Sequence, residues 1–84
     1  LLTIQNVEAS FVAVQVGTGV NISARSLGAV NVQVIMESLG GGGHQTMAAA
    51  QLKHITPEAA RARIQTAIDQ YRESQKKSAP DTKK

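Results

Sequence analysis

The sequence predicts an α/β fold: a small single domain in which a short β-sheet containing a hairpin has two helices packed on it. The 84 residues suffice for one hydrophobic core and are too few for two domains. A hairpin pattern near the start is followed by two segments in which apolar residues recur at helical spacing. Strand and helix patterns in so short a chain indicate helices packed on a sheet.

Residues 9–26 are predicted to form the hairpin. Residues 9–16 are rich in β-branched side chains, which is typical of a buried strand. Residues 20–26 alternate apolar and polar side chains, so one face of that strand carries Asn21, Ser23 and Arg25. We expect a three-residue turn at 17–19, because its two glycines supply the positive φ angles that such turns need.

Two helices and a further strand are expected after the hairpin. Asn31 can cap a helix that ends at Gly40, because apolar residues recur between them at helical spacing. Residues 48–55 predict a third strand, although alanine is a poor strand former. Thr56 is a typical N-cap for a second helix, whose apolar stripe continues to Tyr71.

The predicted domain covers residues 1–71 and is followed by a basic tail, residues 72–84. Charges balance within the domain, so the whole net charge of +3 lies in the tail. The tail lacks apolar periodicity, and we expect a frayed helix end followed by a disordered, solvated terminus. A polyanion groove would instead need basic residues spread along a folded face.

The start of the chain suggests a preceding segment. Residues 1–7 are too few to assign and are interpreted as the end of a helix that continues from upstream. Because the chain begins at Leu1 without an initiator Met, we expect it to be a piece of a longer protein.

Composition excludes several classes of function. The absence of cysteine excludes disulfide scaffolds, thiolate zinc sites and thiol nucleophiles. No apolar run reaches the roughly 18 residues that a membrane span needs, so the fragment itself is expected to be soluble, without membrane contact.

The residues that could support catalysis are scattered. The six acidic residues form no cluster near either of the two histidines, so we expect no metal site in the fragment. No serine or threonine has a local base, so we expect no catalytic residue here. The chain is predicted to bind rather than to catalyse.

Gly40 to Gly43 form a run of four glycines that is followed by His44. Ordering such a run costs much backbone entropy, which suggests contact with a ligand. We expect successive N–H groups to form a seat for phosphate oxygens, at positive φ angles that would strain a β-branched residue at Gly42. His44 can donate a further hydrogen bond. The alternative is a flexible loop with an exposed histidine.

Arg25 lies at the end of the second predicted strand, with Ser23 and Ser26 close by in the sequence. A guanidinium group with short hydroxyl donors beside it suits a phosphate. The alternative is an ordinary arginine on an edge strand, which is the more common case.

The Ser-Ala-Arg-Ser segment at residues 23–26, Asn31 at a helix start and the glycine run with His44 together resemble the DHHA1 domain. This domain is the smaller, C-terminal lobe of DHH-type phosphoesterases. Within that superfamily, the combination is most similar to GdpP-type cyclic di-AMP phosphodiesterases. The resemblance covers most of the predicted domain.

The resemblance implies the substrate-binding lobe of a two-lobe hydrolase. An upstream DHH lobe with an Asp-His-His motif would bind Mn²⁺, and the whole enzyme would hydrolyse cyclic di-AMP to linear pApA. Membrane anchoring of the whole enzyme would place this lobe at the cytoplasmic face of a bacterial cell membrane. By motif position, the implied substrate-binding residues are Ser23, Arg25, Ser26, Asn31, Gly41, Gly42, Gly43 and His44.

Two other functions stay open at this point. The same lobe could belong to an oligoribonuclease of the nanoRNase type, which binds short linear nucleic acids. Alternatively, the chain could be a nucleotide-binding module without catalytic activity. The sequence also allows a homodimer.

Overall fold

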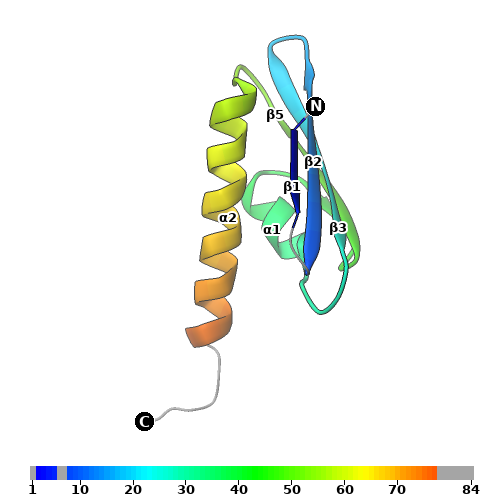
Figure 1. Ribbon diagram of the computed structural model, residues 1–84, viewed down its shortest axis with the longest axis vertical. Helices are drawn as coiled ribbons and strands as arrows, with labels where there is room; N and C mark the ends of the chain where they lie inside the picture. The colour runs from blue at the N-terminus through cyan, green and yellow to red at the C-terminus, as the bar shows by residue number, and fades with distance from the viewer. Residues whose placement is uncertain (1, 6–7, 78–84) are drawn as a thin grey trace.

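The computed structural model describes residues 2–5 and 8–77 and confirms the α/β fold class (Figure 1). Five antiparallel strands form one sheet, in the order β1 (Leu2–Gln5), β2 (Ala9–Val16), β3 (Gly19–Ser26), β5 (Met47–Leu52) and β4 (Gly42–Gly43). The helices of the described residues are α1 (Val32–Ser38) and α2 (Pro57–Lys77). Figure 1 shows both on the same side of the sheet.

The predicted hairpin of β2 and β3 is confirmed, but its turn is shorter than expected. Gly19 pairs with Val16, so only Gly17 and Thr18 lie in the turn. Gly17 has the positive φ of +60°, whereas a Cβ on Gly19 would collide with the carbonyl oxygen of Leu52. The second glycine is therefore needed for close packing against β5 and not for the turn.

Residues 2–5 form a strand, so their interpretation as part of a helix end is wrong. β1 pairs antiparallel with β2, with Ile4 opposite Phe11. Leu2 and Ile4 are half-buried against the core, whereas Thr3 is exposed. The alternation is that of a strand with one buried face, but four residues are too few to show this period in the sequence alone.

The third predicted strand is confirmed with different bounds. β5 ends at Leu52, before the predicted end at residue 55, because His54 has a φ of +55° and breaks the extended backbone. The two-residue strand β4 at the edge was not predicted. Glycine is a poor strand former, so its pairing with β5 leaves no local signal.

Both helices begin at the predicted caps. The Asn31 side chain accepts hydrogen bonds from the backbone N–H groups of Gln33 and Val34, at 3.0 and 3.4 Å. The Thr56 hydroxyl accepts one from Ala59 at 3.1 Å. These bonds satisfy N–H groups that the first turn of a helix leaves without partners.

The second helix continues to Lys77, so residues 72–77 of the basic tail are helical, in the segment for which a frayed helix end was expected. The remaining part of that tail, residues 78–84, lies outside the described residues.

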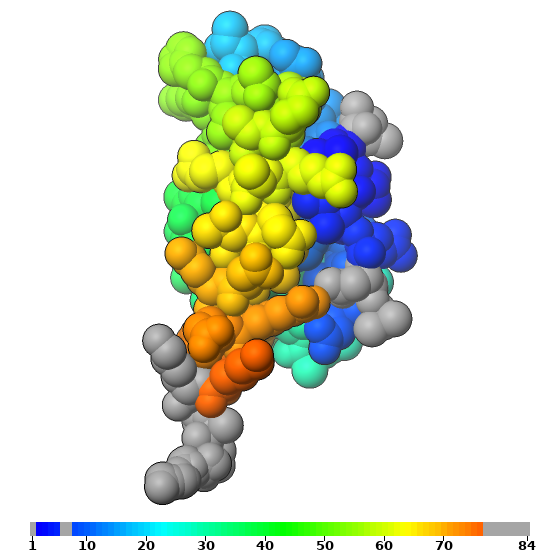
Figure 2. All heavy atoms as spheres, turned by 60° about the vertical axis from the view of Figure 1, so that its left-hand side comes forward, coloured from blue at the N-terminus to red at the C-terminus, as the bar shows by residue number. Residues whose placement is uncertain are grey.

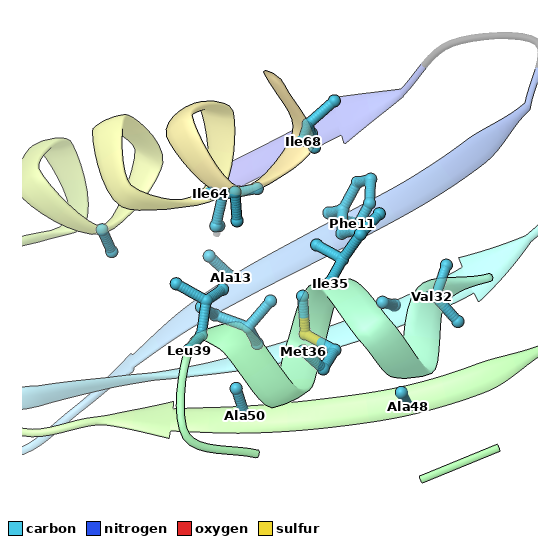
Figure 3. Close-up of a cluster of buried hydrophobic side chains, with 14 of the residues drawn as sticks. Phe11, Ala13, Val32, Ile35, Met36, Leu39, Ala48, Ala50, Ile64 and Ile68 are labelled. Carbon is cyan, nitrogen blue, oxygen red and sulfur yellow. The ribbon is translucent and has the colours of Figure 1, made fainter. Parts of the chain in front are cut away.

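A single apolar layer lies between the helices and the sheet (Figure 3). α1 packs mainly against β5, and α2 packs against β2 and β1. Figure 2 shows α2 on the outside of the molecule, with β1 beside it. No polar or charged residue of the described chain is buried. The largest fully buried side chains are those of Phe11, Val20, Ile22, Val32, Ile35, Met36 and Ile64.

Candidate functional site

The opposite face of the sheet carries neither helix, and we refer to it as the open face. Its residues alternate along each strand with those that point into the core. Strand pairing arranges them in rows that cross β2, β3 and β5. The rows are Ser10, Arg25 and Met47, then Val12, Ser23 and Ala49, then Val14, Asn21 and Gln51.

Arg25 and His44 come from distant parts of the chain and adjoin the same residue, Met47. Arg25 is the direct cross-strand partner of Met47. The backbone N–H of His44 donates a hydrogen bond of 2.7 Å to the Met47 carbonyl oxygen. Both residues are exposed, and the folded chain therefore places Arg25 and His44 at one end of the sheet.

The loop that follows the glycine run is held at the same end. The backbone N–H of Ser26 donates to Thr46 at 2.9 Å, and that of Val32, at the start of α1, donates to Gln45 at 3.1 Å. These bonds connect the end of β3 and the start of α1 to the loop that begins at His44. They explain why residues 26 and 31 belong to the same region as the glycine run.

The side chains of Ser26 and Asn31 have partners within the fold. The Ser26 hydroxyl donates to the Gly28 carbonyl oxygen at 2.9 Å, and Asn31 caps α1. The backbone N–H of Asn31 donates to the Tyr71 hydroxyl at 3.0 Å, which links the cap to α2. Both residues are half-buried, so their observed contacts position the local backbone.

The glycine run does not form the predicted seat of successive N–H groups. The N–H groups of Gly40 and Gly41 donate to carbonyl oxygens of α1 at 3.0 and 2.8 Å, and that of His44 to Met47. Gly40 has a φ of +87° and ends the helix in the left-handed conformation. These N–H groups are consequently not available to a phosphate.

The remaining glycines differ in their surroundings. A Cβ on Gly41 would collide with the Ala49 carbonyl oxygen, and one on Gly43 would lie 2.5 Å from the Cα of Ala48. Gly43 also has a positive φ of +148°, whereas Gly42 does not, so strain at Gly42 was wrongly predicted. A Cβ on Gly42 would meet open space. Close packing against β5 accounts for Gly41 and Gly43.

A hollow of about 630 Å³ lies over β3 and β5 of the open face, beside Gly41. Ser23 lines it, but Arg25 and His44 do not. Polar side chains that sequence reasoning missed also line the hollow: Asn21, Gln51 and Lys53. The alternation in β3 places Asn21 with Ser23, but only the pairing of β3 with β5 adds the other two.

Within residues 2–5 and 8–77, no three or more His, Asp or Glu side chains lie close enough together to hold a metal ion. No helix in this part of the chain has the length and apolar character needed to cross a membrane.

Comparison with known proteins identifies relatives over most of the chain. The family model described as the DHHA1 domain matches residues 1–74. The chain is 58% identical over 77 residues to the cyclic-di-AMP phosphodiesterase GdpP of Geobacillus thermodenitrificans and 57% identical over 72 residues to GdpP of Bacillus subtilis. It is 51% identical over 72 residues to the cyclic-di-AMP phosphodiesterase PdeA of Listeria monocytogenes. These matches cover 84 to 90% of the chain and only 11 to 12% of the relatives.

Proposed function

This chain belongs to the DHHA1 domain family, and from that membership we propose that it is the substrate-binding lobe of a phosphodiesterase. The relatives named as cyclic-di-AMP phosphodiesterases support cyclic di-AMP as the substrate, with linear pApA as the product. The chain corresponds to about a ninth of their length, so a larger part of such an enzyme would lie outside it.

The observation that carries this proposal is the open face of the sheet. It has no helix over it, and it presents Arg25 at the end where the glycine run and His44 meet β5. A phosphodiester is a singly charged anion that a planar guanidinium group can bind with two hydrogen bonds. Among the residues of the open-face rows, Arg25 is the charged one.

Some residues of the site are assigned to direct contact with the ligand, and the others to positioning of those contacts. We assign Arg25 and His44 to the substrate phosphate, and Ser23 to a hydroxyl contact beside the hollow. Gly42 leaves room for the ligand because its position faces open space. Ser26, Asn31, Gly41 and Gly43 position these contacts through the packing and hydrogen bonds of the backbone.

The reaction itself would depend on a second lobe. An upstream DHH lobe with an Asp-His-His motif would bind the Mn²⁺ that activates water for attack on phosphorus. The residues of this chain would bind and orient the phosphodiester in front of that lobe. Membrane anchoring outside this chain, a location at the cytoplasmic face and a homodimer stay predictions.

Substitution of Arg25 tests the proposal in the protein that contains this chain together with its upstream lobe. Loss of a hydrogen-bonded charge should weaken cyclic di-AMP binding in Arg25→Ala by about 10- to 150-fold. Arg61→Ala is the matched control, because Arg61 is exposed on α2, away from the open face. Binding is measured by calorimetry without divalent metal, so that turnover does not interfere.

The same assay separates the other functions. Equal binding by Arg25→Ala and the unsubstituted protein would refute the assignment of the site. Tighter binding of linear pApA than of cyclic di-AMP would favour an oligoribonuclease. Full affinity in the isolated chain, unchanged by the upstream lobe, would favour a binding module without catalytic activity.

A further inference from the structure

The hollow on the open face contains a pair of side-chain amides. Asn21 on β3 and Gln51 on β5 are direct cross-strand partners, and both are exposed. Partners of this kind have Cβ atoms roughly 4.5–5.5 Å apart, so both amides can reach one ligand group. They also line a smaller hollow of about 160 Å³ on their other side. The pair thus lies on the boundary between two hollows.

Neither amide is used by the fold. No hydrogen bond joins the Asn21 or Gln51 side chain to another group in residues 2–5 and 8–77, whereas Asn31 and Gln33 are bonded within α1. Exposed amides have water as their default partner. Two unused amides side by side in a hollow nevertheless provide adjacent donors and acceptors for a ligand.

The rest of the hollow suits a nucleotide. The hollow has a volume of about 630 Å³ and is open to solvent, so a base could lie against its polar side chains. Lys53 adds a positive charge at its border, and Ser23 adds a hydroxyl group. Gly40 and Gly41 border the hollow beside β4.

The hollow and Arg25 lie along the same strand. Asn21 and Arg25 are separated by four positions on β3, which is about 13 Å in an extended strand. Ser23 points to the same face between them. A phosphate at Arg25 and a base at Asn21 would therefore belong to one extended nucleotide ligand along β3.

We propose that the paired amides of Asn21 and Gln51 recognise the base of the substrate and select adenine over guanine. This inference rests on the proposed function. A primary amide presents a donor beside an acceptor, which matches N6–H and N7 of adenine. The same edge of guanine presents two acceptors, O6 and N7, so the oxygen of an amide finds no donor there. The amide pair thus adds base selectivity to the phosphate contacts of Arg25.

The experiment compares cyclic di-AMP with cyclic di-GMP in the protein that contains this chain and its upstream lobe. Dissociation constants are measured by calorimetry without divalent metal. The unsubstituted protein should bind cyclic di-AMP more tightly. In the double variant Asn21→Ala with Gln51→Ala, the ratio of the two dissociation constants should fall by about 5- to 150-fold. This is the discrimination that a good amide–adenine pair provides.

Two further variants complete the design. Gln5→Ala removes an exposed amide from β1, on the same face but away from the hollow, and should keep the preference. Gln51→Glu keeps the length and the acceptor but loses the donor, so it should reduce the preference without removing a side chain. This variant also serves if the double variant fails to fold.

Each outcome has a separate meaning. An unchanged preference in Gln51→Glu and the double variant would overturn the inference and leave the proposed function intact. Equal binding of the two cyclic dinucleotides by the unsubstituted protein would overturn it as well. Failure to bind any cyclic dinucleotide would overturn the proposed function, and the inference with it.

Discussion

Gly41 and Gly42 are neighbours with opposite surroundings. Gly41 lies so close to β5 that a Cβ would meet backbone atoms, which cannot move aside as a flexible side chain could. Gly42 has open space at the same position and no positive φ. Glycine at these two consecutive positions therefore has different explanations: close packing accounts for Gly41, whereas Gly42 has open space that the proposed function assigns to the ligand.

This difference predicts that alanine lowers the stability of the fold at Gly41 and leaves it nearly unchanged at Gly42. Gly41→Ala should destabilise the fold by about 1–3 kcal/mol, the usual range for overpacking. Gly42→Ala should change the free energy of unfolding by less than about 0.5 kcal/mol, as at most surface positions. Chemical denaturation of both variants measures the two values. Equal destabilisation would contradict the packing explanation.

Among the elements, α1 depends most on its cap. It has seven residues, which is too short for a stable isolated helix, so its ends and packing must hold it. Asn31 caps one end, and its own N–H is bonded to Tyr71 of α2. At the other end, Gly40 and Gly41 donate to the last turn. The helix is thus held at the two segments that border the candidate site.

The cap gives a prediction that separates its structural role from substrate contact. Asn31→Ala should cost about 1 kcal/mol of stability, whereas Asn31→Asp retains the cap and should cost little. If Asn31 only supports the loop, Asn31→Asp should also retain most of the binding of cyclic di-AMP. Thermal unfolding and calorimetry measure the two effects. Strong loss of binding in a stable Asn31→Asp variant would instead indicate direct contact with the phosphate.

α2 extends this support across the sheet. Ala60, Ile64, Ala67 and Ile68 are buried on one side of the helix, and the other side is polar. The helix packs against β1 and β2, whereas α1 packs mainly against β5. Together the helices cover one face of the sheet, which leaves its other face available for binding.

At the scale of the whole molecule, the two faces of the sheet have different surroundings. One face carries the apolar core, and no described polar residue is buried in it. The other face carries exposed Asn21, Ser23 and Arg25, together with apolar Val14 and Met47 that are 42% and 54% exposed. In the proposed function, the polar side chains of this face would contact the ligand, and the exposed apolar side chains would contact the second lobe.

This division predicts the behaviour of the isolated chain. It should bind cyclic di-AMP more weakly than the two-lobe protein and release no pApA, with or without added Mn²⁺. The physical reason is that the proposed function assigns metal binding and water activation to an upstream lobe, and only binding of the phosphodiester to this chain. Calorimetry and chromatography of the nucleotide products provide the measurements. Release of pApA by the isolated chain would refute the assignment as a lobe.

Much of the fold could be predicted because its signals are local. Alternation identified β3, apolar periodicity identified both helices, and Asn31 and Thr56 marked their starts. Strand β1 was missed because its four residues show no clear period until β2 lies beside them. Strand β4 was missed because its pairing depends on close approach and not on side chains.

The candidate site was predicted in part. The sequence drew attention to Arg25 and His44 by residue type, and the fold places both beside Met47. The proposed roles of these residues stay predictions. Asn21, Gln51 and Lys53 could not be grouped in advance, because they are brought together by strands that lie far apart in the chain.

The sequence by itself determined the types of β2, β3, β5 and both helices, the two helix N-caps and the face on which Arg25 lies, since these follow from spacing within a few residues. Only the tertiary structure decided which glycines pack and which remain open, and which polar side chains share a hollow. The reason is that strand pairing is governed by burial of a common core. The partners of each backbone segment are thus set by contacts that no local pattern records.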